Sequence, residues 1–147
     1  MKRLLIAGAI AMSSSLPAAA ELISVISNKS VSETIDALEA AVENAGTTVF
    51  ARVDHAGGAK KIGEELADAE LLVFGNPKIG TPAMQANIQA GLYLPLKVLA
   101  YEAEDGTVYL TYEDPTTRLV SLGIDREAPF IAIMKGALGK LTAAAAE

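Results

Sequence analysis

Residues 71–82 read LLVFGNPKIGTP. The first four are apolar without alternation, and the Gly, Asn and Pro that follow favour a buried strand over a helical turn. Thr81 is a good N-cap residue and Pro82 suits the first helical position, so a helix is predicted to begin there. The stretch therefore predicts a central strand, a glycine-bracketed loop over residues 75–81 and a helix start that could hold an anion or a small polar ligand.

Helices and strands alternate on the N-terminal side of this stretch. Residues 22–27 read as a short strand, and Ser30 with Glu33 gives the S-x-x-E capping box of a helix. The apolar residues of that helix fall on one face, and Gly46 stands where a helix usually ends.

A second strand and a second helix are predicted before residue 71. Residues 47–55 alternate, and Val49, Ala51 and Val53 are expected to face the core because the intervening positions include two charges. Residues 59–66 have a helical pattern of apolar and charged positions.

A hairpin is predicted on the C-terminal side. Residues 96–102 and 107–112 are strand-like, and Asp105-Gly106 between them is a strong signal for a tight turn. In this hairpin Tyr101 and Tyr109 are expected to pair across the strands on one face.

The remaining residues predict two helices. Asp114 caps a short one that ends near Gly123, and Asp125 begins a last one whose alanine tail, residues 143–146, is expected to fray. Together these elements predict an α+β fold: a two-layer sandwich in which a mostly antiparallel sheet of about five strands carries helices mainly on one face.

The N-terminus has the three parts of a secretory signal peptide. Lys2 and Arg3 precede an apolar run over residues 4–12, and Ala18-Ala19-Ala20 completes the pattern. The apolar run is shorter than the roughly 20 residues that span a bilayer, although an uncleaved anchor is the alternative. We therefore expect cleavage after Ala20, a single domain over residues 21–147, and a periplasmic or secreted location without membrane contact after cleavage.

Composition excludes several classes of function. The net charge of −6 and the scattered basic residues argue against nucleic acid as a partner. The chain has no cysteine and one histidine, so thiolate chemistry is excluded, and neither a metal site nor a cofactor is expected.

Four segments together resemble one bacterial and archaeal family. They are TVFARVDHA at residues 48–56, residues 70–82 with GNPKIGTP, GLYLPLK at residues 91–97, and YEDP at residues 112–115. Over residues 30–125 the chain is similar to the domain of unknown function 302 family, as an exported single-domain member. The resemblance implies a compact sandwich of helices and sheet that is able to form a homodimer, and it implies no established activity.

Five polar residues are predicted to form a ligand site: His55, Asn76, Lys78, Thr81 and Gln85. They follow predicted neighbouring strands at two junctions between a loop and a helix. The loop has the G-x-x-x-x-G spacing of a phosphate loop but lacks the Lys and Ser or Thr that complete the motif, so it is not a nucleotide triphosphatase loop. A plain strand-to-helix connection remains the structural alternative.

Three functions stay open on the sequence. The first is a binding or sensing module for a small anionic or polar molecule, which uses the five residues above. The second is a small enzyme in which His55 acts as general acid or base, since it is the one side chain with an ordinary pKa near neutrality. The third is a structural or protein-interaction domain without a ligand.

Overall fold

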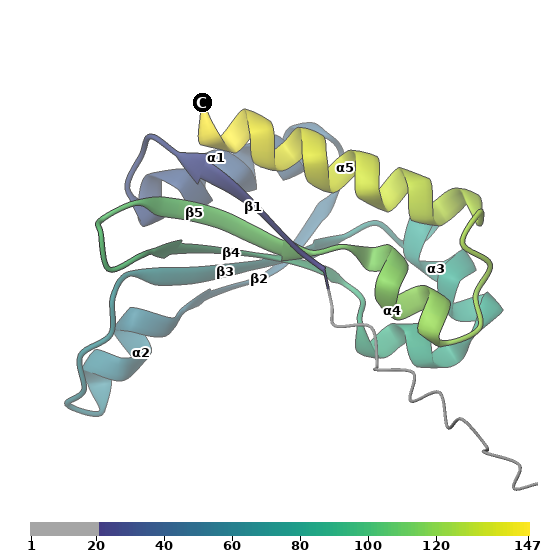
Figure 1. Ribbon diagram of the computed structural model, residues 1–147, viewed down its shortest axis with the longest axis horizontal. Helices are drawn as coiled ribbons and strands as arrows, with labels where there is room; N and C mark the ends of the chain where they lie inside the picture. Colours follow the sequence, from purple (N-terminus) through teal and green to yellow (C-terminus); the bar gives the residue numbers. More distant parts are fainter. Residues whose placement is uncertain (1–20) are drawn as a thin grey trace, which may run out of the picture.

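The computed structural model describes residues 21–147, so the predicted signal peptide lies outside the described part. A five-stranded sheet in the order β1-β5-β4-β3-β2 forms one layer, and every neighbouring pair is antiparallel. Figure 1 shows α1 and α5 together over one face of this sheet, α2 at one end, and α3 with α4 at the other end. The predicted α+β sandwich is confirmed. The elements are β1 (Leu22–Ser27), α1 (Val31–Asn44), β2 (Thr48–Asp54), α2 (His55–Lys61), β3 (Ala69–Gly75), α3 (Pro77–Ala86), the 3-10 helix η1 (Ile88–Leu92), β4 (Leu96–Glu102), β5 (Val108–Glu113), α4 (Pro115–Ser121) and α5 (Pro129–Ala146).

The core lies between the sheet and the pair α1 and α5. Ser30 caps α1 by accepting from the backbone N–H of Glu33, and the Glu33 carboxylate accepts from the backbone N–H of Ser30, which confirms the predicted capping box. Helix α1 then buries Ile35, Leu38 and Val42 completely. Among residues 21–147 no helix has both the length and the apolar character needed to cross a membrane.

The predicted hairpin joins β4 and β5. Gly106 has a φ of +82°, which glycine adopts without strain, and Asp105 accepts from the backbone N–H of Thr107 at 2.9 Å. Tyr101 and Tyr109 face each other across the two strands with ring centroids 5.7 Å apart, as predicted. The turn chemistry thus sets the register of this pair of strands.

Strand β2 departs from simple alternation at Phe50. Val49 and Ala51 pair with consecutive residues of β3, which leaves Phe50 as the extra residue of a β-bulge. A bulge moves all later side chains to the opposite face of the sheet. Arg52 therefore lies on the helix-covered face, and Val53 is 39% exposed on the other face. The prediction that Ala51 and Val53 face the core is wrong for this reason.

Strand β3 is covered on one face only. Leu72 and Phe74 are at most 1% exposed beneath the helices, whereas Leu71 and Val73 are half-buried on the opposite face. The strand predicted as buried for residues 71–74 is therefore buried on one face only, because all its ladders are antiparallel and helices cover mainly one side of the sheet.

Helix α2 begins earlier than the predicted range of residues 59–66. Asp54 caps it by accepting from the backbone N–H of Gly57 at 2.7 Å, so the helix starts directly after β2. Gly63, with a φ of +81°, follows its end, and Ile62 is 78% exposed. The predicted start is too late because the predicted strand includes His55, whereas Asp54 ends the strand and caps a helix that begins at His55.

Both ends of α5 differ from the prediction. Asp125 accepts from the backbone N–H of Glu127 and so forms a separate turn, and the helix begins three residues later with Ala128 as N-cap. The expected fraying of the alanine tail is wrong, because Ala145 is fully buried and its carbonyl accepts from Lys29 Nζ at 3.0 Å.

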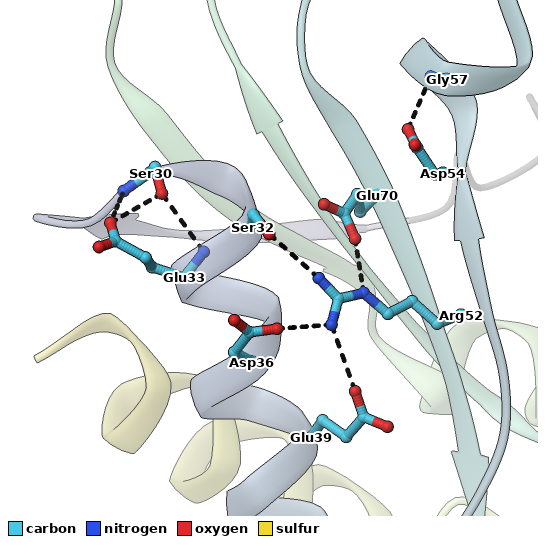
Figure 2. A network of polar contacts seen from close by, with 9 residues as sticks. All are labelled: Ser30, Ser32, Glu33, Asp36, Glu39, Arg52, Asp54, Gly57 and Glu70. Atoms are coloured by element: carbon cyan, nitrogen blue, oxygen red, sulfur yellow. Dashed lines mark hydrogen bonds and ion pairs between the residues drawn. The ribbon is translucent and has the colours of Figure 1, made fainter.

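Arg52 connects the edge strand β2 to its neighbours, as Figure 2 shows. Its Nε donates to Glu70 of β3 at 2.6 Å, and its Nη1 donates to Asp36 and Glu39 of α1 at 2.6 and 3.4 Å. Its Nη2 donates to Ser32 at 3.3 Å. The bond to Glu70 raises the pKa of Arg52 above its usual value despite partial burial. One guanidinium therefore connects α1, β2 and β3.

Asp114 makes a second polar link, between α4 and α5. It caps α4 by accepting from the backbone N–H of Thr116 at 2.8 Å, and it pairs with Lys135 Nζ at 2.9 Å. Burial alone would raise the pKa of the Asp114 carboxyl. The hydrogen bonds from Lys135 and Thr116 have the larger combined effect, so the pKa lies below its ordinary value.

We expect Asp114→Asn to lower the free energy of unfolding at pH 7 by about 1 kcal/mol, because the amide keeps the cap and loses the ion pair. The pKa of Asp114 is lower in the folded than in the unfolded chain, where it is about 3.9. The stability that the ionised carboxylate contributes is therefore present above a pH of about 3.9 and is lost as the pH falls through the folded pKa. Urea unfolding of both proteins should show a difference at pH 7 that shrinks toward pH 3. A difference that is constant with pH would contradict this expectation.

Candidate functional site

An apolar cavity of about 340 Å³ is lined by residues of α3, α5 and the nearby ends of the sheet strands. Figure 1 shows α3 beside the N-terminal part of α5 at this end of the sheet. The ends of β2, β3 and β4 supply one side, and the two helices supply the other. The walls are formed by Thr47, Phe50, Phe74, Gly75, Asn76, Pro77, Ile79, Gly80, Thr81, Met84, Gly91, Leu94, Pro95, Leu96, Met134 and Ala137.

The lining of this cavity is almost entirely apolar and carries no charged side chain. Phe74 and Met134 are 1% and 2% exposed, so the cavity reaches down to the core. Met84 lies on another wall, and flexible thioethers of this kind adapt to ligands of different shape. Ligand sites in proteins are typically concave, largely apolar and equipped with a few polar groups, and this cavity has that character.

Helix α3 begins at Pro77, five residues before the predicted first helical residue, Pro82. Asn76 supplies the N-cap and Pro77 the first helical position, so this pair gives the same start signal as Thr81-Pro82 but earlier in the chain. The prediction of an irregular loop over residues 75–81 is therefore wrong. Pro82 lies inside the helix, where it lacks an N–H to donate to the preceding turn.

The first turn of α3 has its amide groups occupied. The Asn76 side-chain oxygen accepts from the Lys78 N–H at 3.0 Å, and the Asn76 carbonyl is 2.9 Å from the N–H groups of both Ile79 and Gly80. Pro77 has no N–H to offer. A helix N-terminus binds anions through free N–H groups, so this one is poorly equipped to do so.

The structure brings two of the five predicted site residues to the cavity. Asn76 and Thr81 line it, whereas Lys78 and Gln85 are exposed on α3 and are not among its lining residues. His55 lies elsewhere, as the exposed first residue of α2. The single pocket predicted from these residues is thus divided.

The position of His55 follows from the direction of the strands. The predicted pocket required β2 and β3 to end at the same edge of the sheet, but they are antiparallel, with Asp54 opposite Glu70 and Thr48 opposite Gly75. The residues that follow the two strands therefore lie at opposite ends of the sheet, about 20 Å apart for strands of this length. Figure 1 shows α2 and α3 at those two ends.

A wide surface depression of about 740 Å³ lies beside α2, and His55 is not among its lining residues either. Its lining includes five acidic residues, Asp54, Glu64, Glu65, Asp68 and Glu70, together with Lys60, Ser32 and several small or apolar residues. Across the described chain no three His, Asp or Glu side chains gather closely enough to hold a metal ion.

A family model described as "Domain of unknown function DUF302" matches residues 23–147. The chain belongs to this family. The crystal structure of an uncharacterized conserved DUF302 protein from Bacillus stearothermophilus has the same fold, with a TM-score of 0.68 and 21% sequence identity. The match covers 85% of this chain and 94% of that one.

Relatives of this DUF302 domain include two proteins named "Fluoride-specific ion channel FluC 1", from Brucella suis and Brucella abortus. Each is 42% identical over 117 residues, which is 78% of this chain. The matched part is 46% of the first protein and 43% of the second. The chain therefore spans less than half the length of these curated relatives.

Most of the cavity of this DUF302 domain was beyond the reach of sequence reasoning. Phe50, Leu94 and Met134 come from three separate segments that meet only in the folded chain. The one local signal was Gly80, a glycine in the middle of what proved to be a helix, where glycine costs about 1 kcal/mol relative to alanine. The start signal at Thr81-Pro82 places Gly80 in a predicted loop, whereas α3 begins at Pro77 and contains it.

Proposed function

We propose that this DUF302 domain binds a small, uncharged, apolar molecule in the cavity between α3, α5 and the end of the sheet. The observation that carries the proposal is the cavity itself, about 340 Å³ with an apolar lining and Phe74 and Met134 at its base. An apolar cavity of about 150 Å³ is enough to hold benzene. This one is about twice as large, which suits a ligand of about ten non-hydrogen atoms.

The chemistry of the walls favours an uncharged ligand over the anion expected from the sequence. A charged group placed among apolar walls loses its hydration without gaining a partner, which costs several kcal/mol. The occupied first-turn amides of α3 supply no compensating donors. His55 lies at the far end of the sheet, so the cavity supports binding rather than acid–base catalysis by that residue.

Gly80 offers a direct way to fill the cavity. It lines the cavity, and a Cβ placed on it would have Leu94 Cδ1 at 3.8 Å as its nearest neighbour, which is ordinary contact. A leucine there would direct its branched end into the space that the ligand would occupy. Gly139 of α5 is a matched control, because it is exposed and a Cβ there meets nothing within 4 Å.

The test uses acetophenone, an uncharged aromatic ketone, titrated into the purified protein and followed by amide chemical shifts in NMR. At about 0.5 kcal/mol per non-hydrogen atom, a Kd on the order of 0.5 mM is expected. We expect Gly80→Leu to weaken binding at least about tenfold, Gly80→Ala to weaken it less, and Gly139→Leu to leave it unchanged. Shifts outside the cavity, or equal binding by Gly80→Leu, would contradict the proposal.

A second candidate follows from the Brucella relatives. Proteins that contain a segment 42% identical to most of this chain carry the name of a fluoride-specific ion channel over a longer sequence. This observation favours a role beside such a channel, in which this chain would associate with a separate FluC subunit. Co-expression with the FluC protein of the same host, followed by pull-down in detergent and a fluoride efflux assay with and without this chain, tests it. If the two proteins do not associate and this chain does not change efflux, this role is excluded.

A further inference from the structure

The cavity has one polar group whose orientation the fold determines. This is the side-chain amide of Asn76, which lines the cavity and also caps α3. Its Oδ1 is committed to the backbone N–H of Lys78 at 3.0 Å. Because an N–H donor can pair only with the oxygen of the amide, the capping bond fixes which end of the side chain faces the helix.

The other end of this amide is an available donor. Within residues 21–147 no protein acceptor lies in hydrogen-bond contact with Asn76 Nδ2. The cap holds the amide in place, so a ligand that uses this donor does not have to order it first. A preorganised N–H at the edge of an apolar cavity selects for a molecule with an acceptor.

We infer that the ligand of this cavity is an uncharged molecule of about ten non-hydrogen atoms that carries a carbonyl or ether oxygen, which accepts a hydrogen bond from Asn76 Nδ2. The inference rests on the proposed function and narrows it. A ligand with only N–H donors at that position would leave Nδ2 facing another donor. A bare hydrocarbon would leave it without a partner after water is displaced.

The experiment compares acetophenone with ethylbenzene, which has nearly the same shape and no carbonyl, in the same NMR titration. We expect acetophenone to bind about 3- to 10-fold more tightly, the effect of one neutral hydrogen bond. Asn76→Asp should remove this preference, because aspartate is an equally good N-cap and has no donor. Thermal unfolding of Asn76→Asp close to that of the parent protein would verify that the cap is retained.

Two hydroxyls also line the cavity, those of Thr47 and Thr81, and the separate variants Thr47→Val and Thr81→Val distinguish them from the Asn76 amide. The preference for acetophenone should survive Thr47→Val, and its loss there would overturn the inference. The preference for acetophenone should survive Thr81→Val. If it is lost there and kept in Asn76→Asp, the donor is Thr81 and the inference is overturned. Equal binding of both probes to the parent protein would also overturn it while leaving the proposed function intact. If neither probe binds, both proposals fail.

Discussion

Phe74→Ala is expected to lower the free energy of unfolding by about 3–5 kcal/mol, the range for removing a buried aromatic side chain. Phe74 is 1% exposed and belongs to the core cluster shared by the sheet, α1 and α5. It also forms the base of the apolar cavity. Its loss would join existing empty space to new empty space, which neighbouring side chains cannot easily fill. Urea unfolding followed by far-UV circular dichroism measures this, because the chain has no tryptophan to report by fluorescence.

Phe50→Ala is the matched control for Phe74→Ala. Phe50 lines the same cavity but is 55% exposed, so truncating it creates no buried void. The expected loss of unfolding free energy is below about 1 kcal/mol. Phe74→Leu, which keeps most of the volume, should fall between the two alanine variants. A loss below about 1 kcal/mol for Phe74→Ala would mean that the cavity collapses readily, and the binding proposal would lose its main support.

Local signals in the sequence were reliable where one short segment determines the geometry. Ser30 with Glu33 closes a capping box, and Asp105-Gly106 forms the predicted turn, because each depends on residues within a few positions of one another. The apolar spacing of α1 was equally local. These local signals account for α1 and for two of the five strands.

The errors arose where two local signals competed or where pairing decided the outcome. Asn76-Pro77 and Thr81-Pro82 are both good helix starts, and the earlier pair prevailed. The bulge at Phe50 depends on how β2 pairs with β3, which the sequence of β2 alone does not encode. Strand direction separated His55 from the other four predicted residues. The cavity depends on contacts between distant segments, so only Asn76 and Thr81 could be anticipated.

Arg52→Met should lower the free energy of unfolding by about 2 kcal/mol, because it leaves the carboxylates of Asp36, Glu39 and Glu70 near one another without their shared cation. The Glu70 side chain is only 14% exposed and should contribute most of the loss, whereas Asp36, at 64%, is well hydrated and should contribute little. Arg52→Lys keeps the charge but not the planar fork, so about half of the loss should remain. Urea unfolding of each variant provides the comparison.

A double-mutant cycle isolates the contact that matters in this network. Glu70→Gln removes one of the three carboxylates around Arg52. Its effect on the free energy of unfolding should therefore be much smaller in the Arg52→Met background than in the parent protein. The coupling energy between the two positions should be about 1–2 kcal/mol. Asp36→Asn in the same cycle should couple by less than about 0.5 kcal/mol, as exposed pairs do. If the Glu70 coupling is as small as that of Asp36, the backbone ladder alone holds β2 in place. Arg52 would then serve to neutralise the carboxylates that α1 and β3 bring together beside it.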